Sequence, residues 1–169
     1  MHERETPMTQ TMKASDARQR SDEAEIDAII ARPKTGKRVS EIKDELGTVM
    51  NRHVAVFRDE AGLQVALETV KRLKEEARTA YIDDRGTVFN QDVLGSIELG
   101  YMLDAAECTV VAAIERKESR GAQFRTDFPE RNDGEYLKHI NTSRNGDDVP
   151  HVSYSPVTIT QWQPEERKY

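Results

Sequence analysis

The chain is organised around residues 116–133, which read RKESRGAQFRTDFPERND. We call these residues the arginine-rich segment. It follows the most apolar stretch of the chain and holds four arginines, one lysine, four acidic residues and two phenylalanines. Arg116 and Lys117 suit the last turn of a helix, where positive charge opposes the negative end of the helix dipole. Gly121 suits the left-handed position after a helix, and Pro129 prevents a helix from continuing. A helical region is therefore expected to end here.

The residues after Gly121 are harder to explain by stability alone. Phe124 and Phe128 flank an arginine and an aspartate in a stretch too irregular to be core. Protein interfaces are enriched in arginine and aromatic residues. Two hypotheses remain open at this point: a surface loop whose charges pair internally, or a docking segment for another domain or subunit.

The composition excludes several classes of protein. A length of 169 residues favours a single domain, and a net charge of −6 argues against a general nucleic-acid binder, which needs a basic face. No apolar run approaches the roughly 18 residues of a membrane span, so direct membrane insertion is not expected. One cysteine cannot form an internal disulfide, which favours a reducing cytoplasm.

The N-terminal part is the most polar. Residues 1–21 are rich in Thr, Arg, Glu, Gln and Ser, and such a segment buries too little surface to offset its ordering entropy. We expect a disordered or loosely helical tail.

A short helix is expected over about residues 22–32, because Asp22 and Glu25 resemble an N-terminal capping pattern. Its apolar face would consist of Ile26, Ile29 and Ile30, and Pro33 with Gly36 would end it.

Two longer helices are predicted by apolar residues at helical spacing. The first begins at Val39, and the second covers about residues 60–79 after an N-cap at Asp59. Gly47 lies inside the first helix: either the helix tolerates a cost of about 1 kcal/mol, or another backbone approaches closely there. The run Val54 to Phe57 is expected to pack across the bundle. The two apolar stripes are Ile42, Leu46, Val49, Met50 and Val54, and Leu63, Ala66, Leu67, Val70, Leu73 and Ala77.

A fourth helix is predicted over about residues 91–118, with Asn90 as its N-cap. Its apolar residues cover more than one side, which predicts burial on several faces and contact with something besides its own bundle. Cys108 within it is expected to be an inert core thiol. After the arginine-rich segment, a short helix is expected over about residues 134–141. One or two short strands should then contain Val152, Tyr154, Val157, Ile159 and Trp162.

Recognisable catalytic and metal-binding patterns are missing from the sequence. The glycines form no dinucleotide fingerprint, there is no Cys-x-x-Cys, and no two histidines have ligand spacing. Asp83 and Asp84 lack the further acids of a calcium loop. The residues by themselves therefore predict a helical bundle with an interaction surface and no catalytic, cofactor-binding or metal-binding residues.

Several motifs resemble the C-terminal region of the succinate dehydrogenase/fumarate reductase flavoprotein subunit. They are ESRGA at 118–122, RTDFPERND at 125–133, YLKH at 136–139 and the closing ERKY at 166–169. The runs VAVFR at 54–58, VFN at 88–90 and 94–103 are also similar, so the resemblance extends from about residue 38 to residue 169. Gln123 departs from the histidine usual in the family, and Asn132 from an aspartate.

The resemblance implies a fold and a role. The implied fold is mostly α, a three-helix (spectrin-repeat-like) bundle with a short β-containing C-terminal tail. Three parts are then expected: a tail at 1–21, the bundle at 22–118, and a docking segment with a β-containing extension at 119–169. The bundle would pack on the flavin-binding domain of the same subunit. The candidate docking residues, two of them phenylalanines chosen from composition, are Glu118, Arg120, Phe124, Arg125, Asp127, Phe128 and Arg131.

In that family the whole subunit exchanges a hydride between succinate and covalently held FAD and passes electrons to an iron–sulfur subunit. The resemblance implies that FAD belongs to the parent subunit and that this chain binds no cofactor alone. The implied location is cytoplasmic, peripheral at the inner face of the membrane. The alternative is a free-standing helical adaptor that binds another protein. A C-terminal domain of L-aspartate oxidase is a lesser alternative, because the YLKH run and the C-terminal ending are more similar to succinate dehydrogenase.

Overall fold

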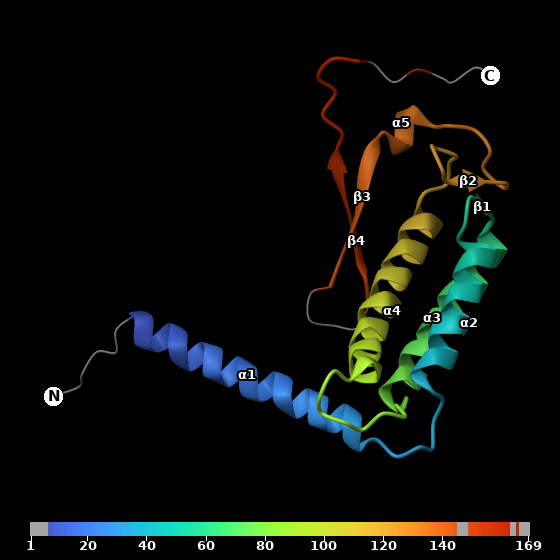
Figure 1. Ribbon diagram of the computed structural model, residues 1–169. Helices are drawn as coiled ribbons and strands as arrows, with labels where there is room; N and C mark the ends of the chain where they lie inside the picture. Colours follow the sequence, from blue (N-terminus) through green and yellow to red (C-terminus); the bar gives the residue numbers. More distant parts are fainter. Residues whose placement is uncertain (1–6, 145–148, 163–164, 166–169) are drawn as a thin grey trace. The chain divides into compact units, whose positions relative to one another are not determined.

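The computed structural model describes residues 7–144, 149–162 and 165, which form a mostly helical fold with two small β-sheets (Figure 1). The helices are α1 (Pro7–Ala31), α2 (Val39–His53), α3 (Glu60–Arg78), α4 (Gln91–Glu115) and α5 (Asp133–Tyr136). The strands are β1 (Phe57–Arg58), β2 (Phe124–Arg125), β3 (Lys138–Ser143) and β4 (His151–Pro156). The predicted mostly α-helical class, with short strands after the last long helix, is confirmed.

The chain divides into two compact units. Of the described residues, the first unit contains 7–44 and 73–102, and the second contains 45–72, 103–144, 149–162 and 165. The buried apolar residues of the first unit are Ile29, Val39, Ile42, Leu73, Ala80, Ile82, Val93 and Leu99. Those of the second unit are Leu46, Val49, Val54, Leu63, Ala66, Val70, Leu103, Ala106, Val110, Ala113 and Tyr136. Most residues of the two predicted stripes are thus buried, and the arginine-rich segment belongs to the second unit.

The side chains predicted to cap two of the long helices do so. Asp59 Oδ1 accepts the backbone N–H of Gly62 at 2.7 Å, and the Asp59 carbonyl accepts that of Leu63. Asn90 Oδ1 accepts the backbone N–H of Val93 at 2.9 Å. Both contacts satisfy donors that have no partner inside their helix. The starts of α3 and α4 are therefore set by local chemistry.

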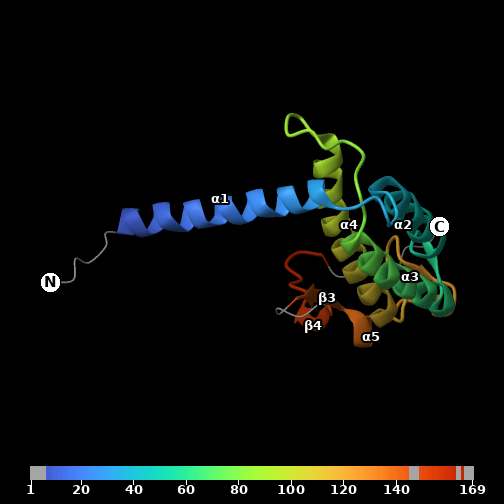
Figure 2. The same cartoon turned by 90° about the horizontal axis from the view of Figure 1, so that it is seen from below.

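Helix α1 begins earlier than predicted. It is one continuous helix from Pro7 to Ala31 in both views (Figures 1 and 2), so the cap predicted at Asp22 is wrong, although the end of the helix is right. Its side chains from residue 15 to residue 28 are exposed, and of the predicted apolar face only Ile29 is fully buried. Alanine, glutamate, arginine and glutamine favour a helical backbone without an apolar stripe, which the search for periodicity could not detect.

Gly47 in α2 lies in open space. A methyl group built on its α-carbon meets nothing within 4 Å among the described residues. Of the two explanations left open by the sequence, close approach of another backbone is therefore not observed. The helix simply tolerates the glycine, at a cost of about 0.5–1 kcal/mol relative to alanine.

Helix α4 is partly exposed, not buried on every face. It ends at Glu115, three residues before the predicted end at 118, and its N-terminal half leaves Leu94, Tyr101 and Met102 exposed by 47%, 71% and 40%. Gly95 and Gly100 on the same half have nothing within 4 Å of an added methyl group. Among the described residues, the first unit therefore leaves part of the apolar surface of this helix uncovered.

The C-terminal region contains less helix than predicted. The helix expected over 134–141 is only the four-residue α5, and residues 138–143 form strand β3. β3 alternates half-buried and exposed residues and pairs antiparallel with β4, with Lys138 opposite Pro156 and Ser143 opposite His151. Because successive side chains of a strand face opposite sides, this alternation fits a strand better than a helix. Residues 157–162, where a strand was also expected, are irregular.

Candidate docking segment

The arginine-rich segment leaves α4 through a tight turn. The backbone N–H of Arg116 still donates to the carbonyl of Ala112, but the helix ends at Glu115, so Arg116 lies just beyond the last turn predicted for it. Gly121 has the expected left-handed backbone, with φ of +59°. It lies in a turn closed by two backbone hydrogen bonds between Arg120 and Gln123, not at the helix end. The predicted conformation is right and its predicted location is wrong.

Arg125 is fully buried, and all five of its N–H donors have acceptors. Nε and Nη2 bind the two carboxylate oxygens of Asp127 at 2.8 Å, and Nη2 also binds Glu60 Oε2 at 2.9 Å. Nη1 donates to the carbonyls of Ala113 at 3.0 Å and Ile114 at 3.4 Å, in the last turn of α4. A cation at a helix C-terminus stabilises the unpaired carbonyls there. Arg125 therefore joins the end of α4 to the start of α3.

Asp127 completes this clamp. Its Oδ2 accepts the backbone N–H of Glu60 at 2.9 Å, so it also caps the N-terminus of α3. The hydrogen bonds from Arg125 lower the pKa of Asp127 to about 2, against the opposing effect of burial. The same contact raises the pKa of Arg125. The pair is therefore ionised over the whole neutral range.

Glu118 is the second fully buried charge. It accepts from Arg116 at 2.6 Å, from Arg120 at 2.7 and 3.0 Å, and from the backbone N–H of Asn132 at 2.8 Å. Burial alone would raise the pKa of Glu118, but these hydrogen bonds outweigh it and hold the pKa below its usual value. Arg120 continues to Asp133 at 2.6 Å. Through these contacts, the start of the segment at Arg116 and its end at Asn132 and Asp133 are linked by two side chains, Glu118 and Arg120.

The phenylalanines of the segment are on the outside. β1 and β2 pair in parallel with Phe57 opposite Phe124 and Arg58 opposite Arg125. Because strand side chains alternate, this register places both phenylalanines on one face and both arginines on the other. The two rings lie edge to face, with centroids 5.6 Å apart. Phe57 is 70% exposed, and Ala55 and Val56 are exposed as well. The prediction that the run Val54 to Phe57 packs across the bundle is therefore right only for Val54, which is buried.

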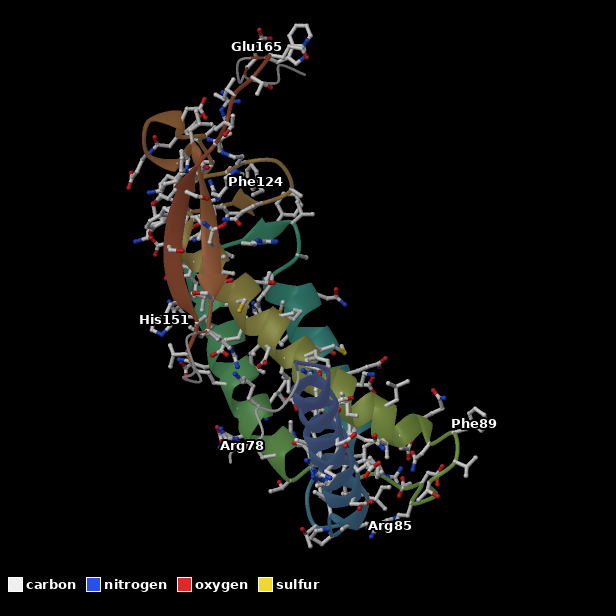
Figure 3. All side chains as sticks on the ribbon, turned by 90° about the vertical axis from the view of Figure 1, so that its left-hand side faces the viewer. Arg78, Arg85, Phe89, Phe124, His151 and Glu165 are labelled. Atoms are coloured by element: carbon white, nitrogen blue, oxygen red, sulfur yellow. The ribbon has the colours of Figure 1, made fainter. Side chains whose placement is uncertain are left out.

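Phe128 lies beside the same arginine. The Arg125 guanidinium is 5.0 Å from the centre of the Phe128 ring, and the ring is 38% exposed. Phe124, which Figure 3 labels, is 37% exposed. We call Phe57, Phe124 and Phe128 the aromatic surface. Within this set the Phe128 ring lies against the buried, fully bonded Arg125, and the Phe57 and Phe124 rings lie against each other.

The structure separates the predicted docking residues into two groups. Glu118, Arg120, Arg125 and Asp127 make their contacts inside the second unit, as the hypothesis of internally paired charges stated. Arg131 binds Asp133 at 2.6 Å and donates to the carbonyl of Glu165 at 2.7 Å. Phe124 and Phe128 remain available at the surface. The sequence did not indicate that Glu60 binds Arg125 or that Phe57 pairs with Phe124. Its only signals were that Glu60 is an acid at the start of a helix and that Phe57 is an aromatic residue shortly before that helix.

Among the described residues, no group of three His, Cys, Asp or Glu side chains could hold a metal ion. Cys108 is a free, partly buried thiol. Asp83 binds Lys34 at 2.6 Å and Arg38 at 3.3 Å, and the backbone N–H groups of residues 83 and 84 donate to Asp92. No helix of the described part of the chain is long and apolar enough to cross a membrane.

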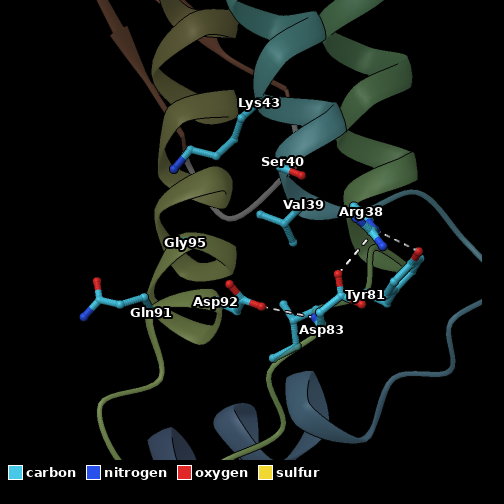
Figure 4. A pocket seen from close by; sticks show the side chains of 10 residues that line it. Arg38, Val39, Ser40, Lys43, Tyr81, Asp83, Gln91, Asp92 and Gly95 are labelled. Carbon is cyan, nitrogen blue, oxygen red and sulfur yellow. Dashed lines mark hydrogen bonds and ion pairs between the residues drawn. The ribbon is translucent and has the colours of Figure 1, made fainter.

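The first unit contains a pocket beside these charges (Figure 4). Its volume is about 270 Å³, and its lining includes Arg38, Lys43, Tyr81, Asp83 and Asp92. Arg38 is already bound to Asp83 and to the Tyr81 hydroxyl, at 3.3 Å each, and Lys43 pairs with an acid of α4 at 3.4 Å. Because both cations are already paired and Arg38 is exposed, this pocket is a weak candidate for a binding site.

Comparison with known proteins gives consistent matches. The family model described as "Fumarate reductase flavoprotein C-term" matches residues 43–169. The fumarate reductase flavoprotein subunit of Haemophilus influenzae is 48% identical over 130 residues, which cover 77% of this chain and 22% of that protein. The succinate dehydrogenase flavoprotein subunit of Rickettsia felis is 34% identical over 122 residues, covering 72% of this chain and 20% of that protein.

A solved structure of Escherichia coli quinol fumarate reductase matches with a TM-score of 0.81 and 31% identity, covering 96% of this chain and 27% of that chain. The chain therefore spans only about a fifth to a quarter of the length of these relatives.

Proposed function

Because this chain belongs to the fumarate reductase/succinate dehydrogenase flavoprotein C-terminal family, we propose that it supports the chemistry of such a subunit by docking. Its partners are the flavin-binding domain of the same subunit and the iron–sulfur subunit. The activity supported is FAD-dependent interconversion of succinate and fumarate. In this proposal the chain contributes no catalytic residue and no cofactor ligand of its own.

The observation that carries the docking proposal is the aromatic surface. Phe57 and Phe124 come from segments far apart in the sequence, are paired edge to face, and stay exposed by 70% and 37%. Exposed aromatic residues held on a rigid base are typical of the anchors that dominate protein interfaces. Arg131 and Asp133 of the same segment are partly exposed and offer polar groups for a contact as well.

The charged docking residues have a different part in this proposal. Glu118, Arg120, Arg125 and Asp127 shape the segment, while Phe124 and Phe128 make the contact. Reversing a buried charge such as Arg125 would disrupt the second unit as well as docking. The aromatic residues are therefore the sharper place to test the function.

We also propose the finer architecture that the family implies. α2, α3 and α4 would form a three-helix, spectrin-repeat-like bundle, which is supported in the second unit by a core cluster drawn from all three helices, including Val49, Leu63 and Val110. The functional parts would be the tail at 1–21, the bundle at 22–118 and the docking extension at 119–169. The assembled subunit would act in the cytoplasm, peripherally at the inner face of the membrane.

The test is assembly with the flavin-binding domain and the iron–sulfur subunit, co-expressed with this chain and measured by size-exclusion chromatography with flavin absorbance and fumarate reduction. Phe57→Ser and Phe124→Ser are each expected to weaken assembly at least about tenfold. Phe89→Ser is the matched control, because Phe89 is 93% exposed in the first unit and projects away from the ribbon (Figure 3). Thermal unfolding of the isolated variants checks that each is folded: the free energy of unfolding should fall by about 1 kcal/mol for Phe57→Ser and by about 1–3 kcal/mol for Phe124→Ser, whose ring is less exposed.

Equal assembly by all three variants would contradict the docking proposal. The second candidate function, a free-standing helical adaptor, rests on the same exposed rings. The adaptor function predicts that the chain binds another protein. It also predicts that Phe57→Ser changes neither the flavin content nor the rate of fumarate reduction. A loss of flavin-linked activity that follows the loss of assembly would exclude the adaptor.

A further inference from the structure

The second unit contains an open pocket that the docking proposal does not use. It lies where β1, α4, the arginine-rich segment and β3 meet, and its volume is about 370 Å³. That volume is at the lower end of the range of small-molecule sites in proteins. Its lining consists of Arg58, Cys108, Thr109, Ala112, Ala113, Arg116, Gln123, Ile140 and Thr142. Among the described residues, no acidic side chain belongs to this lining.

Arg58 is the unusual member of the pocket. It is half-buried, and burial lowers the pKa of its guanidinium. Its Nε donates to the carbonyl of Ala55 at 2.6 Å and its Nη1 to Gln123 Oε1 at 3.0 Å. An arginine has five N–H donors, so three of them have no acceptor among the described residues. Unlike Arg116 and Arg125, Arg58 has no carboxylate partner in the described part of the chain.

The neighbours of Arg58 hold it in place without neutralising it. Gln123 Nε2 donates to the carbonyl of Arg116 at 3.1 Å, which fixes the amide that binds Arg58. Arg116 directs its own N–H groups to Glu118 and to the carbonyls of Tyr136 and Lys138, at 2.6 to 3.0 Å. The Arg58 guanidinium is thus oriented, partly desolvated and without a carboxylate partner among the described residues. Arg116 beside it already pairs its charge with Glu118.

We infer that this pocket is a binding site for a small organic carboxylate held by Arg58. A planar guanidinium fork matches a carboxylate with two parallel hydrogen bonds, and one uncompensated charge matches a monoanion. Ala112 and Ile140 offer apolar surface for a short carbon chain, and Thr109 and Thr142 offer hydroxyl groups. The inference concerns the chain alone and does not depend on the docking proposal.

The experiment uses the full chain, labelled with ¹⁵N, and follows its NMR spectrum during titration with sodium butyrate at constant ionic strength. Butyramide, which has the same shape without the charge, is the ligand control. We expect saturable shifts of the Arg58 Nε–H signal and of the amides of Thr109, Gln123 and Thr142. The dissociation constant should lie in the millimolar range, because a single charge-assisted pair in an open pocket supplies most of the affinity.

Arg58→Gln should weaken butyrate binding by about tenfold or more, and Arg58→Lys, which keeps the charge but loses the fork, should weaken it less. Arg78→Gln is the matched control, because it removes an arginine whose side chain is 61% exposed on α3 (Figure 3). Circular dichroism checks that each variant is folded. Shifts that do not saturate, equal shifts with butyramide, or unchanged binding by folded Arg58→Lys and Arg58→Gln would overturn the inference.

Discussion

Replacement of Arg125 by methionine tests whether the arginine-rich segment organises the second unit. Methionine is also long and unbranched at the β-carbon, but it has no charge and no donor. The change would leave the carboxylates of Asp127 and Glu60 without their guanidinium. The carbonyls of Ala113 and Ile114 would lose the Arg125 donor, and Ala113 would keep only the 3.4 Å hydrogen bond from Gln123 Nε2. The substitution therefore removes the cation of a buried ion-pair cluster and keeps both of its carboxylates.

The magnitude follows from the burial of each partner. Removing one member of a buried pair costs about 3–5 kcal/mol. The side chain of Arg125 is 0% exposed, but those of Asp127 and Glu60 are 30% and 45% exposed and can regain water. We therefore expect Arg125→Met to lower the free energy of unfolding by about 2–4 kcal/mol. For a chain of this length that is a fall in Tm of about 4–16 °C.

The assay is urea denaturation followed by circular dichroism at neutral pH, with Arg125→Lys as an intermediate variant. Lysine keeps the charge but cannot reach all five acceptors, so its loss should be smaller than that of methionine. Arg78→Met, on the exposed surface of α3, should change stability by less than about 0.5 kcal/mol. Asp127→Asn, alone and combined with Arg125→Met, completes a double-mutant cycle.

Two results would refute the reasoning. A loss below about 1 kcal/mol for Arg125→Met would mean that the buried pair contributes no more than an exposed one. Full additivity of Arg125→Met and Asp127→Asn would mean that the two side chains do not act together, because residues in direct contact show coupling of about 0.5–3 kcal/mol.

Two further predictions concern acid and the glycine of α2. Because the folded-state pKa of Asp127 is lowered to about 2 from 3.8, the stability from its ionised form is present above about pH 4 and is lost as the pH falls toward 2. Urea titrations across this range should show a loss of about 1–2 kcal/mol, allowing for solvent screening, and Asp127→Asn should remove that component. Gly47→Ala should raise the free energy of unfolding by about 0.5–1 kcal/mol, since the added methyl group meets nothing; a lower Tm would show that another surface approaches this position.

Local patterns in the sequence were sufficient for the long helices. The capping side chains of Asp59 and Asn90 act on backbone groups three residues away, so their effect is visible in a short window. The left-handed backbone of Gly121 follows from its missing β-carbon. The apolar stripes of α2 and α3 became buried because helical spacing places such residues on one face. The motifs of the arginine-rich segment were also enough to indicate the family.

Only the tertiary structure decided what the segment does with its charges. Arg125 and Glu60 are separated by 65 positions in the chain, and β1 meets β2 across a similar interval. The local pattern does not show that Arg125 is buried and fully hydrogen-bonded. Nor does it show that Arg58, its neighbour in the sheet, keeps N–H donors without an acceptor among the described residues. The length of α1 and the change from helix to β3 were missed for a related reason, because helix propensity without periodicity and strand pairing across a loop leave little local signal. Burial and pairing depend on which distant backbone and side-chain groups the fold brings together, and a single sequence does not list those neighbours.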